Sequence, residues 1–379
     1  MDINPTKNKS VVILDLRDSP WVDGPGRTIL DCASSLEGKK YHFIIGTFSG
    51  GEQKTNSYSD EAKRRKLQLF KIRENSAFDI NVGRQIIKVI KENNVNIIHT
   101  HDFRSNIFGL ICGKLCRKPV ITTVHGWIAN DVKGKLYILI DKLLLRFFDN
   151  VISVSNKTAE LIKKSYISDK KLTVINNALK VENYKLDKDF CEIRTEFGID
   201  KEEILIANIG RLSPEKGQLD FLRLAKKILE FNDDVKFILI GIGPDQNILE
   251  SYVEKNNIKE SVIFAGFRNN MNDIYNEIDL VIQSSYTEGM PNVILEALLM
   301  ETPVIASDVG GTSEIIKDKV NGVLFEKGRI DQLVIEVNRY LKNTEHFKIL
   351  AKEGRKNILQ NFSHSKRIKQ LDQLYDKYS

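Results

Sequence analysis

Cysteine, proline and long hydrophobic runs are all scarce in this sequence of 379 residues, which has 4 cysteines and 8 prolines. The cysteines are too few and too scattered for a disulfide framework; they are Cys32, Cys112, Cys116 and Cys191. No run approaches the roughly 18–20 uninterrupted apolar residues that a membrane-spanning helix needs. The first apolar stretch, VVILDL at 11–16, is too short for the core of a signal peptide. We therefore expect a cytoplasmic protein.

Signatures of nucleic-acid and metal binding are also missing. The net charge is +6, and no basic run is interleaved with aromatic residues, so we expect no nucleic-acid partner. An Asp-x-Asp pair, which could hold a divalent ion, occurs once, at Asp187 and Asp189. Because this pair lies in a charged segment and does not follow a strand-like run, we expect neither a metal nor another cofactor.

Short apolar runs alternate with longer amphipathic segments through almost the whole chain. In the first half, such runs occur at 11–16, 41–48, 96–101, 119–125, 150–155 and 172–177, and helix-like stretches such as 26–36, 80–93 and 105–116 separate them. Runs that are continuously apolar indicate strands buried on both faces, hence a parallel sheet covered by helices. The first half therefore predicts one α/β domain.

The character of the sequence changes at residues 178–203, which are highly charged and contain no strand-like run. We interpret them as a linker with a short helix. The pattern then resumes at 203–210, 235–241, 261–266, 278–285 and 302–308. This repetition predicts a second doubly wound α/β domain. Ligands of such sheets bind beyond the carboxyl ends of the strands, so the chemistry is expected just after each apolar run.

The segment GRLSPEKG follows the first strand-like run of the second half. It places Arg211 and Lys216 in the turn before an amphipathic stretch at 218–230. A planar guanidinium and a compact ammonium group together suit a diphosphate. Two surface cations on an ordinary strand–helix loop explain the segment equally well when it is taken alone.

The segment EGMPNVILE follows the run at 278–285 and carries two carboxylates eight positions apart, Glu288 and Glu296. A carboxylate accepts from two neighbouring hydroxyl groups, and free amides at a helix start bind a hydroxyl or phosphate oxygen. Glu296 lies within an otherwise apolar helical stretch, VILEALLM. This setting argues against the alternative that Glu296 is a solvated surface residue.

GRLSPEKG, EGMPNVILEA and TPVIASDVGGTSEII, in this order and spacing, resemble the C-terminal domain of family-4 retaining glycosyltransferases, also called glycosyl transferases group 1. The resemblance covers nearly the whole chain and includes the tail NFSHSKRIKQLDQLYDKY. It implies the GT-B fold, in which two Rossmann-like domains face each other across a cleft and a final helix crosses back to the first domain. The domains implied are 1–180 with 362–379, a linker at 181–201, and a nucleotide-sugar domain at 202–361.

The resemblance also implies roles for residues of the second half. Arg211 and Lys216 would bind the donor diphosphate, and Glu296 the ribose hydroxyls. Glu288 would contact the transferred sugar near its reacting carbon, together with the backbone of the loop that follows it. The residues that would line the donor in this half are Phe267, Arg268, Gly289, Met290, Pro291, Asn292, Val293 and Glu296.

In the first half, His125 follows a strand-like run at the place where the family has a histidine facing the donor sugar. Alone, a histidine at this place is as compatible with a structural role. Gly24 and Gly26 match the family's glycine-rich loop, which approaches the diphosphate. This loop departs from the usual pattern because Pro25 separates the glycines and no acidic residue follows them, which puts an acidic contact from this loop in doubt.

Family membership would make the protein a retaining, metal-independent enzyme. It would move a hexosyl or N-acetylhexosaminyl unit from a UDP- or GDP-sugar to a saccharide or lipid-linked acceptor, in cell-surface polysaccharide synthesis. A nucleotide-sugar epimerase and a non-catalytic binding relative are the alternatives. The stretch 133–150 mixes large apolar residues with four cations, which suits peripheral contact with an anionic membrane at the inner face of the cell. A helix packed on the sheet is the competing interpretation.

Overall fold

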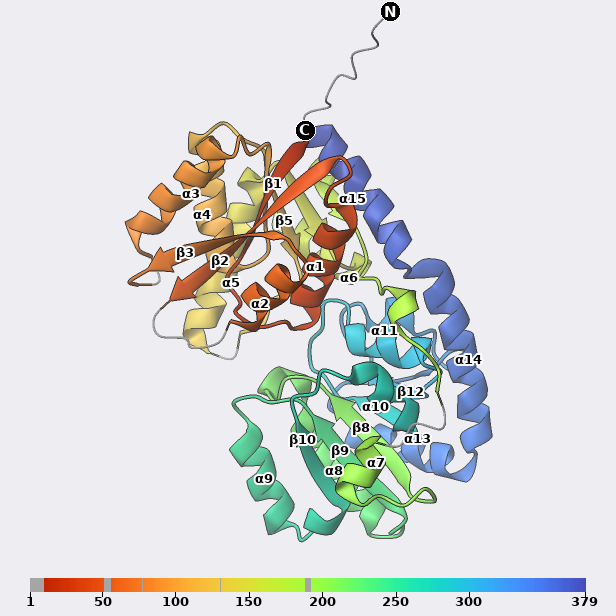
Figure 1. Cartoon of the computed structure of the whole chain (residues 1–379). Helices are drawn as coiled ribbons and strands as arrows, with labels where there is room; N and C mark the ends of the chain where they lie inside the picture. Colours follow the sequence, from red (N-terminus) through yellow and green to blue (C-terminus); the bar gives the residue numbers. More distant parts are fainter. Residues whose placement is uncertain (1–9, 51–55, 77, 130, 188–191) are drawn as a thin grey trace, which may run out of the picture. The chain divides into compact units, whose positions relative to one another are not determined.

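The computed structural model describes residues 10–50, 56–76, 78–129, 131–187 and 192–379. The chain divides into two compact units, 1–177 with 364–379 and 178–363. Each unit is built on one sheet whose paired strands are all parallel (Figure 1). The predicted pair of Rossmann-like α/β domains is thereby confirmed.

The sheet of the first unit has seven strands in the order β3-β2-β1-β4-β5-β6-β7. The strands are β1 (Val11–Arg17), β2 (Tyr41–Gly50), β3 (Gln68–Glu74), β4 (Ile97–Thr100), β5 (Val120–Val124), β6 (Asn150–Ser153) and β7 (Leu172–Val174). The helices are α1 (Gly24–Leu36), α2 (Ser57–Arg64), α3 (Ile80–Glu92), α4 (Phe103–Leu115), α5 (Val132–Leu144), α6 (Asn156–Lys163) and α15 (His364–Tyr378).

The alternation of side chains along each strand divides the core of this unit between the two faces of the sheet. On one face, strand residues such as Leu14 and Ile98 pack with α3 and α4. On the other face, strand residues such as Ile13 and Ile121 pack with α1, α2 and α15. Both faces are buried, which explains why the strands are continuously apolar in the sequence.

Helix α15 belongs to the first unit although it ends the chain, and Figure 1 shows it, in blue, beside α1, in red. The Tyr41 hydroxyl group lies 2.7 Å from Oδ1 of Asp372, and the Tyr375 ring packs edge-on against those of Tyr41 and Phe43. The return of the final helix to the first domain is therefore confirmed.

The sheet of the second unit has six strands in the order β10-β9-β8-β11-β12-β13. They are β8 (Ile204–Ile209), β9 (Val235–Ile240), β10 (Val262–Gly266), β11 (Leu280–Gln283), β12 (Val304–Ser307) and β13 (Val323–Phe325). The helices are α7 (Glu192–Phe197), α8 (Gln218–Leu229), α9 (Gln246–Lys255), α10 (Met271–Glu277), α11 (Asn292–Leu299), α12 (Thr312–Ile315), α13 (Ile330–Lys342) and α14 (Thr344–Asn361).

Helix α7 lies in the segment expected as a linker and is fixed firmly to the second unit. Its Arg194 is almost fully buried and donates to the backbone oxygens of Glu277, Asp200 and Glu203 and to Oδ2 of Asp279. The Glu277 carboxylate in turn accepts from the backbone amide of Arg194 at 2.8 Å. These contacts satisfy the otherwise unpaired first amides of a short helix.

Helix α5 was expected to continue to residue 150, but it ends at Leu144, and a 3-10 turn, Leu145–Phe147, leads to β6. Asp141 is the one buried residue of α5, and its carboxylate accepts from Asn106 at 2.7 Å and from the Trp127 indole at 2.8 Å. The opposite side of α5 is apolar and exposed, and the 3-10 turn continues it. We call this surface the exposed α5 face; its residues, spaced three or four apart, are Val132, Leu136, Leu139 and Leu143 of α5 and Phe147 of the turn. Within the described part of the chain, no helix combines the length and hydropathy needed to cross a bilayer.

Candidate active site

Each sheet has a point where the strand order reverses, and ligands of open α/β sheets bind at that point beyond the carboxyl ends of the strands. In the second unit the reversal lies between β8 and β11. The loop 210–217 follows β8 and the loop 284–291 follows β11, so the two segments singled out in the sequence flank this point.

Lys216 and Glu288 meet across it, with 2.7 Å between Nζ and Oε1. The same carboxylate oxygen accepts from the Ser285 hydroxyl at 2.7 Å and from the Gln283 amide at 3.1 Å. The Glu288 side chain is 9% exposed and that of Lys216 is 26% exposed. A half-buried cation is thus held beside a fixed carboxylate, an arrangement suited to a ligand that carries both phosphate and hydroxyl groups.

Backbone contacts hold the surrounding loops in place. Three hydrogen bonds of 2.8 Å end on backbone carbonyl groups of these loops. The Tyr286 amide donates to the Glu215 carbonyl, and the Ser284 hydroxyl donates to the Gly217 carbonyl. The Gly311 amide donates to the Gly289 carbonyl. The loop after β12 can come this close because Gly310 has φ +52°, and a Cβ there would lie 1.8 Å from the carbonyl oxygen of Glu288. The paired glycines of this segment therefore bring backbone against backbone at the base of the site.

Helix α11 begins at the end of the second loop. Its N-cap residue is Pro291, so Asn292 and Val293 lie in the first turn, where backbone amides have no partner within the helix. Glu296 is 5% exposed and lies 3.1 Å from the Tyr275 hydroxyl group. Glu296 is therefore not a solvated surface residue, as its apolar setting in the sequence predicted. The loop residues Gly289 and Met290 lie between Glu288 and this helix start.

The remaining donor-side candidates have different surroundings. Arg211 is exposed, and its guanidinium makes no hydrogen bond or ion pair within the described part of the chain. Phe267, just after β10, is 58% exposed. Arg268 makes two bonds to the Glu196 carboxylate, at 2.6 and 2.7 Å, and lies over the Phe197 ring. Its guanidinium is therefore occupied by α7.

In the first unit the strand order reverses between β1 and β4. The glycine loop after β1 is shaped by Arg17, a buried residue that the sequence argument did not single out. Its guanidinium lies 2.5 Å from Asp23, the N-cap of α1, which accepts from the Gly26 amide at 2.8 Å. A Cβ at Gly26 would lie 1.9 Å from the Arg17 guanidinium. Gly26 is therefore needed for the fit of Arg17, while Gly24 begins the helix.

Acidic residues gather at the same edge. The Asp18 carboxylate lies 3.0 Å from the Arg104 guanidinium. The backbone amide of Asp18 donates to the Asp102 carboxylate at 2.9 Å. Arg104 also pairs with Glu74. Burial raises the pKa of Asp18 to about 7; the Arg104 charge opposes this shift, and the Asp102 and Glu74 charges reinforce it. The sequence offered no signal for this cluster because its members are far apart in the chain.

The histidines that follow β4 and β5 lie on one face of the sheet. His101 Nε2 is 3.1 Å from Asp15 Oδ2, and His101 Nδ1 is 3.3 Å from His125 Nε2. His99 bonds to Tyr375 and to Thr123, both at 2.8 Å. Both His99 and His101 are buried, which suits a packing or supporting role.

Of the residues described, one set of three could bring metal ligands together, namely Asp15, His99 and His101, whose ligand atoms lie within 4.8 Å of one another. All four ring nitrogens of these histidines already have hydrogen-bond partners in the protein. A cation would have to displace these hydrogen bonds, so we interpret the three residues as a polar network in the core. Of the Asp-x-Asp pair, Asp189 lies outside the described residues, as does Cys191.

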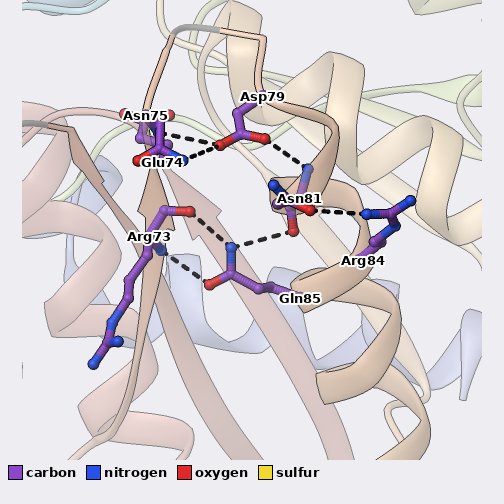
Figure 2. A pocket seen from close by; sticks show the side chains of 7 residues that line it. All are labelled: Arg73, Glu74, Asn75, Asp79, Asn81, Arg84 and Gln85. Carbon is purple, nitrogen blue, oxygen red and sulfur yellow. Dashed lines mark hydrogen bonds between the residues drawn. The ribbon is translucent and has the colours of Figure 1, made fainter.

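A further pocket of about 470 Å³ opens at the carboxyl end of β3. Figure 2 shows Gln85 of α3 bonded to the Arg73 backbone, and Asp79 bridging Asn75 and Asn81. All seven lining residues are polar: Arg73, Glu74, Asn75, Asp79, Asn81, Arg84 and Gln85. This pocket could not be predicted from the sequence, because β3, like β13, lacks the continuous apolar run that predicted the other eleven strands.

Two family models match the chain, one in each half. The family described as Glycosyl transferases group 1 matches residues 189–357, and Glycosyltransferase Family 4 matches residues 22–183. The UDP-Gal:alpha-D-GlcNAc-diphosphoundecaprenol alpha-1,3-galactosyltransferase of Escherichia coli is 30% identical over 300 residues, covering 76% of this chain and 77% of that protein. The capsular polysaccharide biosynthesis glycosyltransferase CapM of Staphylococcus aureus is 22% identical, with coverage of 74% and 77%.

Among solved structures, Anabaena HepE in complex with UDP and glucose superimposes with a TM-score of 0.87 at 20% identity, covering 97% of this chain and 100% of that one. At this identity the likeness concerns the fold, which is of the GT-B type.

Proposed function

Because the chain belongs to the family-4, group 1 glycosyltransferases, we propose that it transfers a hexosyl or N-acetylhexosaminyl unit from a UDP-sugar to a lipid-linked saccharide, with retention of configuration and without a metal. The observation that carries the proposal is the Lys216–Glu288 pair at the strand reversal of the second unit. UDP is proposed because the E. coli relative is named for a UDP-sugar and HepE was solved with UDP.

Lys216 and Arg211 supply the positive charge that a departing diphosphate requires. As the bond between the anomeric carbon and the diphosphate breaks, negative charge grows on the phosphate oxygens. Preorganised cations and helix-start amides stabilise this charge most in the transition state. Two cations and the first turn of α11 make a divalent ion unnecessary for this step.

Glu288 is proposed to bind hydroxyl groups of the sugar, and Glu296 those of the ribose. Retention follows if the acceptor oxygen bonds to the anomeric carbon on the face from which the diphosphate leaves. The acceptor proton then passes to a phosphate oxygen of the departing UDP. No carboxylate has to act as a nucleophile in this scheme, so Glu288 keeps its bonds to Lys216 and Ser285 until substrate replaces them.

The first unit is proposed to take the acceptor and to lie against the inner face of the cell membrane. The exposed α5 face is flanked by Lys133, Lys135, Lys142 and Arg146. Such a combination of apolar and cationic side chains suits the surface of an anionic bilayer. A lipid-linked acceptor, as in the name of the E. coli relative, and a role in cell-surface polysaccharide synthesis, as in that of CapM, would place the enzyme there.

A panel of UDP-, GDP- and ADP-sugars, each with and without an undecaprenyl-diphosphate-linked sugar, tests the proposal by release of free nucleotide. We expect release with a UDP-sugar only when acceptor is present, unchanged by EDTA, and an α-linked product from an α-linked donor. Turnover without acceptor would indicate an epimerase or hydrolase. Loss of activity in EDTA would overturn the proposal that no metal is needed. A β-linked product would overturn the proposal that configuration is retained.

A further inference from the structure

The polar pocket at the carboxyl end of β3 lies wholly within the first unit. The last residues of β3, the turn after it and the first turns of α3 form its walls, as Figure 2 shows. Its volume of about 470 Å³ falls in the range of roughly 300–1,000 Å³ that is usual for small-molecule sites. All seven lining side chains end in a planar polar group, that is, a carboxylate, an amide or a guanidinium. Such a lining suits a ligand that is polar over most of its surface.

Hydrogen bonds hold the centre of the pocket in place. In Figure 2 the side-chain groups of Asn75, Asp79, Asn81 and Gln85 lie between the end of β3 and α3. Gln85 accepts from the backbone amide of Arg73 at 3.0 Å and donates to its carbonyl group at 2.7 Å. The backbone amides of Asn81 and Asn75 donate to the Asp79 carboxylate at 2.8 and 3.1 Å and lower the pKa of that group. A ligand therefore meets groups that are already oriented, so little side-chain entropy is lost on binding.

Several hydrogen-bonding atoms of the pocket have no partner among the described residues. Asn81 accepts from Arg84 at 3.0 Å through Oδ1, and its Nδ2 donates to none of these residues. Asn75 donates from Nδ2 to Asp79 at 3.2 Å, and its Oδ1 is unpaired among them. The Arg73 guanidinium likewise makes no hydrogen bond or ion pair with any described residue. Unused donors and unused acceptors therefore line the same pocket.

This mixture of groups favours a neutral ligand that carries hydroxyl groups. A hydroxyl group both donates and accepts, whereas a phosphate group only accepts and would meet the unpaired oxygen of Asn75. Of the lining residues, Arg73 and Arg84 are cations and two are carboxylates, so the charges of the lining balance. A pocket without net charge gives an anion no electrostatic advantage. A planar carboxylate, amide or guanidinium can bond to two neighbouring hydroxyl groups, which common pyranose rings offer.

Glu74 connects the pocket to the strand reversal of the first unit. Its carboxylate binds Arg104, and the Arg104 guanidinium lies 3.0 Å from Asp18 in the loop after β1. Only β2 separates β3 from β1 in the sheet. At about 4.8 Å per strand, the ends of β3 and β1 are on the order of 10 Å apart. The pocket is therefore a neighbour of the point where an open α/β sheet binds its principal ligand.

We propose that this pocket is a sugar subsite of the first unit, which binds one neutral pyranose ring of the acceptor saccharide. Because β2 sets the pocket apart from the strand reversal, the ring that it binds differs from the ring that receives the transferred sugar. The acceptor then carries at least two sugars, so another glycosyl transfer must precede this one. That the ring belongs to the acceptor rests on the proposed function. That the pocket takes a neutral sugar rests on its own donors, acceptors and charges.

Side-chain amide signals in the NMR spectrum of the ¹⁵N-labelled full chain test the pocket directly. The variants Asn75→Ala and Asn81→Ala identify the two signals by their loss. The probes are the methyl glycosides of glucose, galactose and N-acetylglucosamine in the millimolar range, and inorganic phosphate. We expect at least one glycoside to shift both signals in a saturable way and phosphate to shift neither. No shift with any glycoside, or a shift with phosphate alone, would overturn the proposal.

Two substitutions should weaken this binding. Arg73→Ala and Asn81→Ala each remove one hydrogen-bonding group from the lining, so the Kd of the glycoside, read from the Asn75 signal, should rise about 3- to 10-fold. The backbone bonds of Arg73 are kept in its variant. The matched controls are Lys71→Ala and Lys91→Ala, which remove exposed cations of β3 and α3 that do not line the pocket. An unchanged Kd in both pocket variants, or an equal rise in the controls, would overturn the subsite.

Kinetics with the acceptor that supports nucleotide release test whether the bound sugar belongs to the acceptor. Asn81→Ala should raise the KM for that acceptor about 3- to 10-fold and leave the KM for the nucleotide sugar as in the wild type. An unchanged acceptor KM would overturn the assignment to the acceptor, with the proposed function intact. A wild type that binds the glycoside but transfers to no acceptor would overturn the proposed function and leave the sugar subsite standing.

Discussion

The exposed α5 face makes a quantitative prediction about membrane binding. Its five residues are 83% (Val132), 53% (Leu136), 56% (Leu139), 46% (Leu143) and 61% (Phe147) exposed. Full burial of one such side chain is worth about 1.5–3 kcal/mol. Leu139 and Leu143 are each about half exposed, so together they should gain roughly 1.5–3 kcal/mol on entering the interface. Replacing both by Gln should therefore weaken vesicle binding about 10- to 150-fold.

Sedimentation with vesicles that contain anionic lipid measures this affinity. The matched control is the pair Ile335→Gln and Ile349→Gln in the second unit, whose side chains are 51% and 59% exposed. We expect the control to bind like the wild type, and neutral vesicles to bind both weakly because the flanking cations contribute about 1 kcal/mol each at an anionic surface. Transfer to a water-soluble acceptor should be unchanged in Leu139→Gln/Leu143→Gln. Equal binding of this variant and the wild type, or no binding by the wild type, would refute the membrane role of α5.

Three further changes test particular residues. The raised pKa of Asp18, about 7 against 3.8, means that its contribution to stability is complete below about pH 4 and is lost as the pH rises through 7. The stability of the wild type relative to Asp18→Asn should therefore fall by at most about 1.4 kcal/mol per pH unit between these values, read from urea unfolding by tryptophan fluorescence; a difference constant with pH would contradict this. Gly310→Ala should lower the free energy of unfolding by about 1–3 kcal/mol more than Gly328→Ala does. Both glycines have positive φ, but only a methyl group at Gly310 would meet backbone atoms closer than 2 Å. Equal midpoints of the two variants in thermal unfolding would contradict this close approach. Gly26→Ala should displace the Arg17 guanidinium and lower the thermal midpoint of the first unit. Gly83→Ala is the control, because Gly83 also lies in a helix of this unit and its Cβ would meet only the Cys112 sulfur, at 3.7 Å. An equal midpoint in both variants would contradict the close fit of Gly26 and Arg17.

The architecture was largely predictable because most strands are buried on both faces. Each of the eleven continuous apolar runs contains a strand. The alternation of these runs with amphipathic segments predicted the two parallel sheets. The two strands that were missed, β3 and β13, both lie at sheet edges. Strand β3 has a single buried residue, Ile72, among exposed and half-buried ones, and β13 has only three residues. Neither has the long apolar run that burial on both faces requires.

The site was predictable to the extent that it is local in the sequence. Lys216 and Glu288 follow apolar runs directly, so topology alone brought their loops together, although the ion pair between them was not foreseen. Asp15 and Arg17 were not predicted, because a charged residue within or beside an apolar run does not indicate its partner. Asp15 meets His101, 86 residues away, only through the tertiary fold, whereas Arg17 pairs with Asp23 in the loop that follows β1.

The central claim is that Lys216 binds the diphosphate of the donor, and calorimetric titration of UDP into three proteins tests it most directly. The proteins are the wild type, Lys216→Ala and Lys236→Ala. Lys236 is a matched control because it is 21% exposed and lies 3.4 Å from Glu203, but it stands near the amino end of β9. Loss of a charge-assisted bond worth about 1.5–3 kcal/mol predicts UDP binding about 10- to 150-fold weaker in Lys216→Ala and unchanged in Lys236→Ala. Equal affinity in Lys216→Ala and the wild type would contradict the account.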